Sequence, residues 1–320
     1  MAKTIGILTS GGDAPGMNAA IRAIVRAGIK AGFDVYGIKR GYKGLIENDM
    51  ELMTVGSVAD IIHRGGTILK TARCSEFATE QGLYKAIESI SARNIDALVV
   101  IGGDGTLKGA KALVEKGIVC HHIPATIDND LGYTDYTIGF DSAVNTVLSA
   151  INNIRDTGMA HDKTTVIEVM GRDCGDIALR AGVAGGADAI LIPEMDMDVD
   201  EMCSIICAGM ERKKKHHIIV RAEGANITLD MIEEAVKRRT GEETRKVILG
   251  YLQRGGAPTA LDRMISTLMG VRVIELINND ENSKAVAYAE NRVIEIDVQK
   301  AVDIKRQPDL ELMEIAKALV

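Results

Sequence analysis

The sequence predicts an α/β fold with two doubly wound α/β domains, each built on a mainly parallel sheet. Short apolar runs rich in β-branched residues recur along the chain, as in residues 4–9, 96–101 and 118–123. Such runs are typical of buried parallel strands. Stretches with helical spacing of apolar residues alternate with them, which is the pattern of an α/β protein. The length of 320 residues favours two domains over one small core.

The first strand, residues 4–9, runs into a glycine-rich segment, Ser10–Gly16, and then into a helix predicted over Met17–Ala31. The apolar face of that helix has the spacing i, i+3, i+4, i+7 in Ile21, Ile24, Val25 and Gly28. Glycines allow close approach of a ligand, and a helix N-terminus favours an anion. The segment matches neither a Walker A loop nor a dinucleotide fingerprint. Phosphate binding and a plain structural turn both stay open here.

The next elements continue the alternation up to the middle of the chain. We predict a strand at Val35–Ile38, a glycine-rich turn at Gly41–Gly44, a helix at Val58–His63 and a helix at Leu83–Arg93. Residues 64–77 between those two helices form a long, glycine-rich irregular segment. Irregular segments of this length inside an α/β domain are usually functional.

A helix at Phe140–Asp156 is expected to lead into the second domain. Strands are predicted at 165–169, 189–193, 217–222 and 246–252, with a helix carrying Cys203 and Cys207 between the second and third of them and a long helix at 262–278. From Lys284 the tail alternates short strand and helix. The predicted domains are 1–139 with 252–302, which binds the nucleotide, and 140–251 with 303–320.

Composition excludes several classes of protein. The net charge is −7, aromatic residues make up 3% and tryptophan is absent, so we expect no nucleic-acid partner. The five cysteines include no C-x-x-C pair, which argues against a disulfide framework and a cysteine zinc site. No apolar run reaches the roughly 18 residues of a membrane span, and the N-terminus lacks the apolar region of a signal peptide. A cytoplasmic protein without a membrane partner is expected.

Two acid-containing stretches follow neighbouring predicted strands. Asp104 lies among the glycines of Gly102–Thr106, and Asp128 and Asp130 lie in Pro124–Asp130. Ligands of open α/β sheets bind at the carboxyl ends of strands, and phosphoryl transfer needs a metal-side acid and a base. If the second stretch is extended, Asp128 and Asp130 share one face. The alternative is a turn with Asx hydrogen bonds.

The motifs together resemble the bacterial ATP-dependent 6-phosphofructokinases along essentially the whole chain. The resemblance rests on five stretches in this order: Gly6–Ala20, Gly102–Thr106, Thr126–Asp130, Met170–Arg172 and Gln253–Gly256. Gly-Gly-Asp-Gly-Thr alone also occurs in NAD kinases and lipid kinases, but the full set is specific. The resemblance implies phosphorylation of fructose 6-phosphate by Mg²⁺-ATP, a phosphofructokinase-like fold and a homotetramer with shared sites.

The resemblance also implies roles for individual residues. The ATP site would comprise Gly12, Tyr42, Arg73, Cys74, Phe77, Gly103, Asp104, Gly105 and Thr106, with Asp104 on Mg²⁺ and Phe77 near the adenine. Asp128 would be the base, Asp130 would help to place metal or phosphate, and Gly12, Thr126 and Arg172 would complete the catalytic set. The sugar phosphate would contact Thr126, Ile127, Asp128, Lys163, Met170, Gly171, Arg172, Glu223, Arg245, Tyr251 and Arg254.

Basic clusters acquire a role from the same resemblance. Taken alone, the pair Arg22 and Arg26 and the run 211–217 are typical of solvated helix surfaces. The resemblance places an effector site for ADP or phosphoenolpyruvate on Arg22, Arg26, Arg155, Gly186, Asp188, Arg212, Lys214, Lys215 and His216.

Some positions depart from the family pattern. Tyr251 replaces a phosphate-binding histidine and Lys163 an arginine, so that the sugar phosphate loses a charge and a bidentate contact. Val55 replaces an effector-site arginine, and Lys213 stands where glycine is usual.

Two small residues, Gly105 and Ala125, indicate which phosphoryl donor the protein uses. Gly105 and Ala125 leave room for a nucleotide where pyrophosphate-dependent relatives carry an aspartate and a lysine, which favours ATP; Tyr251 leans towards pyrophosphate. A pyrophosphate-dependent kinase and a non-catalytic nucleotide sensor stay as alternatives.

Overall fold

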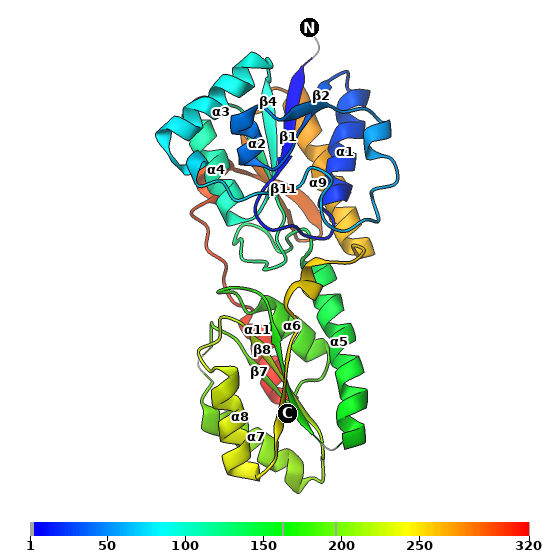
Figure 1. Ribbon diagram of the computed structural model, residues 1–320, viewed down its shortest axis with the longest axis vertical. Helices are drawn as coiled ribbons and strands as arrows, with labels where there is room; N and C mark the ends of the chain where they lie inside the picture. Colours follow the sequence, from blue (N-terminus) through cyan, green and yellow to red (C-terminus); the bar gives the residue numbers. More distant parts are fainter. Residues whose placement is uncertain (1–2, 162, 196, 320) are drawn as a thin grey trace. The chain divides into compact units, whose positions relative to one another are not determined.

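The computed structural model describes residues 3–161, 163–195 and 197–319 and divides into two compact units (Figure 1). Unit 1 comprises Met1–Ser142 with Arg254–Arg306, and unit 2 comprises Ala143–Gln253 with Gln307–Val320. The chain passes between units at 142/143, 253/254 and 306/307, where the sequence placed the boundaries at 139/140, 251/252 and 302/303. Among the helices of the described residues, none is long and apolar enough to cross a membrane.

Unit 1 is built on a seven-stranded sheet in the order β11-β10-β5-β4-β1-β2-β3. Its strands are β1 (Thr4–Thr9), β2 (Asp34–Ile38), β3 (Met50–Leu52), β4 (Ala97–Gly102), β5 (Cys120–Pro124), β10 (Lys284–Ala289) and β11 (Arg292–Asp297). All neighbouring pairs are parallel except β2 with β3 and β10 with β11. Edge strands of opposite direction are common on otherwise parallel sheets.

Helices cover both faces of this sheet (Figure 1). They are α1 (Met17–Lys30), α2 (Tyr42–Glu47), α3 (Glu80–Ala92), α4 (Asp104–Glu115), α9 (Ala260–Asn278) and α10 (Val298–Ala301), with short 3₁₀ turns at Gly56–Val58 and Glu76–Ala78. The predicted apolar face of α1 is fully buried: Ile21, Ile24 and Val25 are 0% exposed, and Gly28 is also buried. A second core lies under α2, α3 and α4 and includes Leu45, Leu98 and Leu107.

Strand register brings three loops to one edge of the sheet. Thr9 at the end of β1 is opposite Ile101 on β4, and Gly102 at the end of β4 is opposite Pro124 at the end of β5. The segments that leave β1, β4 and β5 therefore begin side by side. This is the edge at which open α/β sheets bind ligands.

Unit 2 is built on a four-stranded, wholly parallel sheet in the order β7-β8-β6-β9. Its strands are β6 (Thr164–Val169), β7 (Ala189–Leu191), β8 (His217–Ala222) and β9 (Thr244–Ile248). Its helices are α6 (Asp176–Ala184), α7 (Val199–Glu211), α8 (Leu229–Thr240) and α11 (Leu310–Ala318), and α5 (Phe140–His161) carries the chain into it. One core, with Met202, Ile206 and Ile232, joins α7 and α8 to the sheet.

Three local predictions were wrong. The segment predicted as a turn at Gly41–Gly44 supplies the N-cap Gly41 and the first half of helix α2. The predicted helix at Val58–His63 is a 3₁₀ turn at Gly56–Val58 followed by turns, because Asp60 adopts a left-handed φ of 52° that a helix cannot contain. The strand predicted over 246–252 ends at Ile248 and gives way to a 3₁₀ turn at Gly250–Arg254, whose first residue has φ 51°.

Candidate active site and effector site

The loops after β1, β4 and β5 are in direct contact. Ser10 N–H donates to Ile101 O at 3.0 Å, and Ala125 N–H donates to Gly102 O at 2.9 Å. A Cβ on Gly102 would lie 2.3 Å from Thr106 Oγ1 and 2.4 Å from Ser10 O, so only glycine fits there. A Cβ on Gly103 would lie 3.4 Å from Thr126 Cβ. The glycine-rich loop of Gly102–Thr106 thus touches both of its neighbours.

Asp104 is the first residue of α4. The sequence indicated only that Asp104 lies among glycines after a strand, and the structure begins a helix there, with Gly103 as N-cap. The helix N-terminus favours an anion close to these backbone amides. A Cβ on Gly105 would meet nothing within 4 Å, so the space in front of this first turn is open, whereas Ala125 is buried at 1% exposure.

The chemistry of Asp104 fits a magnesium ligand. Its carboxylate is 39% exposed and accepts one ion-pair hydrogen bond from Lys108 Nζ at 2.7 Å. Mg²⁺ usually takes one or two protein carboxylates and completes its shell with water and substrate phosphates. Within the part of the chain that the structure describes, no three-residue cluster of His, Cys, Asp or Glu could hold a metal alone, so a metal here would depend on the phosphates it accompanies.

The other candidate ATP-site residues lie around α4. Tyr42 and Phe77 are buried and stacked, with ring centroids 3.9 Å apart. Tyr42 Oη donates to Thr106 O at 2.7 Å, which ties α2 to the first turn of α4. Arg73 is exposed and Cys74 is half-buried. The two rings therefore form a buried wall that supports the glycine loop.

Residues 126–130, which we call the acid turn, are not extended. Asn129 has a left-handed φ of 53° and is 0% exposed. Its side-chain oxygen accepts from Thr137 N at 3.0 Å and Thr137 Oγ1 at 3.3 Å, and its amide donates to Asp135 O at 3.1 Å. The extended segment, in which Asp128 and Asp130 would share one face, is therefore not formed. A turn forms instead, but the Asn129 side chain bonds to Asp135 and Thr137, six and eight residues further on, whereas the side chain of an Asx turn bonds to the adjacent backbone.

Asp128 lies in the buried part of the acid turn. It is 2% exposed, and its N–H donates to Thr126 Oγ1 at 3.2 Å. Thr126 O in turn accepts from Thr137 Oγ1 at 2.6 Å. Ile127 is also buried, whereas Asp130 is half-buried. The backbone that carries the buried Asp128 side chain is therefore fixed, and a general base needs a fixed position.

Gly12, in the loop between β1 and α1, lies next to Arg254. A Cβ on Gly12 would lie 2.9 Å from Arg254 Nη1. The absence of a side chain at Gly12 is what admits the guanidinium. An arginine fork at this position suits a phosphate.

In unit 2, residues 170–172 form a second held turn, which we call the arginine turn. Arg172 has φ 53°. The N–H groups of Gly171 and Arg172 donate to Glu223 Oε1 at 3.2 and 2.9 Å, and Met170 N–H donates to Gln253 Oε1 at 3.1 Å. Three backbone donors of this turn are thus fixed by two distant side chains.

The remaining sugar-phosphate candidates are at the surface of unit 2. Lys163 lies 3.7 Å from Glu243 Oε2. Arg245 on β9 is exposed, and Tyr251 is 79% exposed.

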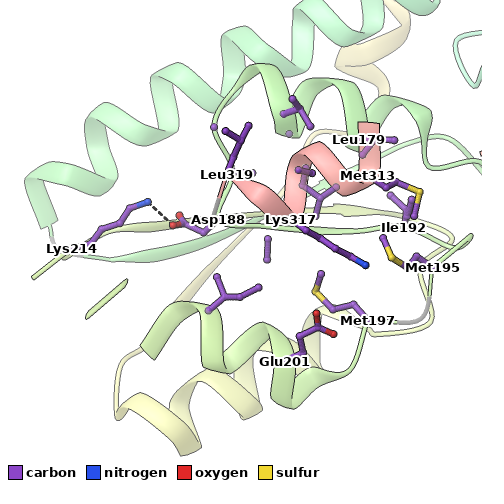
Figure 2. A pocket seen from close by; sticks show the side chains of 18 of the residues that line it. Leu179, Asp188, Ile192, Met195, Met197, Glu201, Lys214, Met313, Lys317 and Leu319 are labelled. Atoms are coloured by element: carbon purple, nitrogen blue, oxygen red, sulfur yellow. Dashed lines mark hydrogen bonds and ion pairs between the residues drawn. The ribbon is translucent and has the colours of Figure 1, made fainter. Parts of the chain in front are cut away.

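The effector candidates of unit 2 cluster at the ends of α6 and α7. Arg155 donates to the carbonyl oxygens of Gly185 and Gly186. Asp188 accepts from Lys214 Nζ and from Ile218 N, the latter at 2.9 Å (Figure 2). Burial raises the pKa of Asp188, but hydrogen bonds from His217, Lys214 and Ile218 outweigh it and lower that pKa to about 2. Asp188 is therefore ionised at neutral pH.

The other effector candidates are distributed over both units. Arg22 is half-buried and Arg26 exposed on α1 of unit 1. Arg212 and Lys215 are exposed and His216 is half-buried. Burial, together with the charges of Lys214 and Arg155, lowers the pKa of the His216 imidazole.

Two structural residues were missed by sequence reasoning. Gln253 is 0% exposed and holds Met170. Arg221 is 6% exposed and binds Glu168, Ile227 O, Glu223 O and Ala225 O, which fixes the loop that carries Glu223. Its signal was available, because an arginine inside the apolar run 217–222 must have a buried partner. Gln253 belongs to the motif Gln253–Gly256, but nothing in that motif indicated its contact with Met170.

Comparisons with known proteins agree with one another. Residues 4–277 match the family described as Phosphofructokinase. The chain is 53% identical over 317 residues to an ATP-dependent 6-phosphofructokinase of Alkaliphilus metalliredigens, and 51% identical over 317 residues to one of Clostridioides difficile; in both cases 99% of each chain is covered.

Solved structures give the same fold. Phosphofructokinase from Saccharomyces cerevisiae superposes with a TM-score of 0.92 at 32% identity, over 98% of this chain and 50% of that longer one. A pyrophosphate-dependent phosphofructokinase from Marinobacter aquaeolei superposes with a TM-score of 0.86 at 21% identity, over 97% of this chain and 86% of that one. The second similarity concerns the fold alone.

Proposed function

The chain belongs to the phosphofructokinase family, and on this premise we propose that it transfers the γ-phosphoryl group of ATP to the 1-hydroxyl of fructose 6-phosphate. The products are fructose 1,6-bisphosphate and ADP. The observation that carries the proposal is the contact between the glycine loop and the acid turn, which places the Asp104 helix start beside Thr126. The names of full-length relatives at 53% and 51% identity support ATP as donor.

Asp128 is the general base in this proposal. The sugar 1-hydroxyl gives its proton to the Asp128 carboxylate as its oxygen forms a bond to the γ-phosphorus, and the bond to the ADP oxygen breaks in line. The buried position of Asp128 and its fixed backbone support this role. Asp130, half-buried one residue beyond Asn129, helps to place metal or phosphate.

The donor is held by the start of α4 and the loops beside it. Asp104 would hold Mg²⁺, which would neutralise charge on the transferring group. The amides of Gly103 to Thr106 and the open space at Gly105 receive phosphate, and Gly12, Thr126 and Arg172 complete the catalytic set. Arg73, Cys74 and the wall of Tyr42 and Phe77 border the nucleotide.

The sugar phosphate is held by the arginine turn and by cations. Met170, Gly171 and Glu223 contact the sugar, and Arg254 holds the 6-phosphate. Tyr251 lies at the same phosphate, Arg245 and Lys163 reach it from a neighbouring subunit, and the enzyme is a homotetramer. Their surface position in one chain supports this arrangement.

Regulation and location complete the proposal. ADP or phosphoenolpyruvate binds the effector residues Arg22, Arg26, Arg155, Gly186, Asp188, Arg212, Lys214, Lys215 and His216, and the enzyme acts in the cytoplasm. The ionised Asp188 beside Lys214 suits a site that handles a metal-bound anion.

The test is product formation with a single donor. We expect fructose 1,6-bisphosphate from fructose 6-phosphate and Mg²⁺ with ATP and none above background with pyrophosphate. Product from pyrophosphate alone would assign the chain to the pyrophosphate-dependent enzymes and make Tyr251 the better guide. Nucleotide binding without product from either donor would indicate a sensor.

A further inference from the structure

Unit 2 contains a pocket of about 360 Å³ beside the edge strand β7. Its walls come from α6, α7, α11 and residues 186–192. Large apolar side chains dominate one part of it, namely Leu179, Ile192, Met195, Met197, Met313 and Leu319. Leu319 at its rim is 73% exposed. Leu179, Ile192 and Met313 are at most 4% exposed, so the apolar part of the pocket is enclosed by the fold and is reached past the exposed Leu319.

The pocket has two ends of different chemistry. Figure 2 shows Asp188 and Lys214 at one end and Met195 and Met197 at the other, and Lys317 of α11 extends towards the methionines, where its charge faces the same end as Glu201. Arg212 also lines the pocket. The gradient from a charged end to an apolar end is that of an amphipathic ligand.

Cations prevail at the charged end. Lys214 donates to Asp188, which stays ionised because its hydrogen bonds lower its pKa to about 2. That pair is neutral as a whole, and Arg212, two residues before Lys214 in the sequence, brings a further positive charge to the pocket lining. Glu201, on α7, is the acid at the other end, beside Met197 (Figure 2). A headgroup bound next to Arg212 should therefore be an anion.

The apolar end suits a flexible chain. Three methionines line the pocket, and methionine adapts its shape to irregular apolar partners. The volume is at the lower limit of small-molecule sites. A peptide strand is a poorer occupant, because β7 offers an edge of only three residues.

We propose that this pocket binds an amphipathic anion, an aliphatic chain ending in one carboxylate or phosphate, with its headgroup on Arg212 and Lys214 and its chain among Met195, Met197 and Met313. The inference rests on the proposed effector site, because Gly186, Asp188, Arg212 and Lys214 belong to both. It adds an apolar extension to that site and a class of ligand that the site would take besides small phosphorylated effectors.

The test is calorimetric titration of the full-length protein with decanoate below its micelle concentration. We expect Met197→Glu, which puts a like charge beside the chain, to weaken binding about tenfold or more, and the milder Met197→Gln to weaken it about threefold. Arg212→Gln should weaken it about fivefold. Met231→Glu, on the exposed surface of α8, is the matched control and should leave binding unchanged.

Decanol, which lacks the carboxylate, tests the headgroup, and the decanoate variants test the pocket. Decanol should bind much more weakly than decanoate; equal affinity would overturn the assignment of the headgroup. Decanoate binding that is unchanged by Met197→Glu, Met197→Gln and Arg212→Gln would overturn the pocket.

Phosphoenolpyruvate, titrated in parallel, distinguishes this inference from the effector site. Its binding should be lost in Arg212→Gln and kept in Met197→Glu. If phosphoenolpyruvate fails to bind while decanoate binds with the expected variant pattern, the effector proposal falls and the pocket stands. The opposite pattern rejects the pocket and keeps the effector site.

Discussion

The acid turn of unit 1 and the arginine turn of unit 2 both hold a non-glycine residue in a left-handed conformation, but different contacts stabilise the two turns. Each follows a strand, and each contains a non-glycine residue at φ 53°, Asn129 in one and Arg172 in the other. Asn129 is fully buried and is held by contacts within its own loop, to Asp135 and Thr137. The arginine turn is exposed at Arg172 and is held by Glu223 and Gln253, which are far away in sequence.

The difference teaches how each turn relates to its ligand. A base must keep one orientation whether or not substrate is present, so a self-contained and buried turn suits Asp128. A turn that recognises a substrate can depend on other loops, because binding energy can complete its order. Variants in the two turns should therefore change turnover in one case and substrate affinity in the other.

The largest effect is expected from Asp128→Ser. Removal of the base should lower turnover by about 10²–10⁴ and leave ATP and sugar-phosphate binding nearly unchanged. Steady-state kinetics and equilibrium binding measure the two quantities. Asp303→Ser, at an exposed position of unit 1, is the control. Near-normal turnover in Asp128→Ser would remove Asp128 from the role of base.

Asn129→Gly should cost about 3 kcal/mol of stability in unit 1, because three hydrogen bonds, two of them buried, are lost while φ stays permitted. Asn129→Ala should cost about 1 kcal/mol more, since alanine resists a left-handed φ. Urea unfolding gives both values. If the two variants are equally stable, the turn does not depend on the left-handed conformation of residue 129.

Glu223→Gln sharpens the comparison from the other side. Glutamine can still accept from Gly171 and Arg172, but charge-assisted hydrogen bonds are about twice as strong as neutral ones. We expect the KM for fructose 6-phosphate to rise about fivefold, which corresponds to about 1 kcal/mol, with kcat within about twofold. A fall in kcat at constant KM would show that the arginine turn acts on the transition state instead.

Lys213→Gly should have the smallest effect, and it is of opposite sign. Lys213 has φ 65° directly after the C-cap of α7, where glycine is favoured. The Asn129 side chain holds its left-handed conformation through hydrogen bonds to Asp135 and Thr137. The Lys213 side chain makes no such hydrogen bond with the described residues. Glycine should stabilise unit 2 by about 0.5–1 kcal/mol, measured as an upward shift of the unfolding midpoint. Destabilisation would mean that the Lys213 side chain makes a favourable contact.

Most strands could be predicted from sequence because each is an uninterrupted apolar run. Residues 4–9 and 217–222 coincide with β1 and β8 from end to end. The helix at Met17–Ala31 was predicted to within one residue, because its apolar spacing matches the burial of one face. These signals are local, and the structure follows them.

The acid turn could not be predicted in the same way. Its shape depends on Thr137, eight residues beyond Asn129, and no periodicity records such a contact. The start of α4 at Asp104 was missed because glycines on either side obscure a helical pattern. The candidate residues near these points were identified by resemblance to a family, and the contacts that fix them came from the structure.

The order of strands in unit 1 has a consequence for protein synthesis. The neighbour of β5 in the sheet is β10, and Cys120 N–H donates to Ser283 Oγ across 163 residues of sequence. A ribosome adding about 5–20 residues per second needs roughly 8 to 33 seconds for that interval. Until then the backbone N–H and C=O groups on one edge of β5 are unpaired, and another strand could form non-native hydrogen bonds with them. The nascent chain therefore carries an unprotected strand directly before the acid turn until most of the protein has been made.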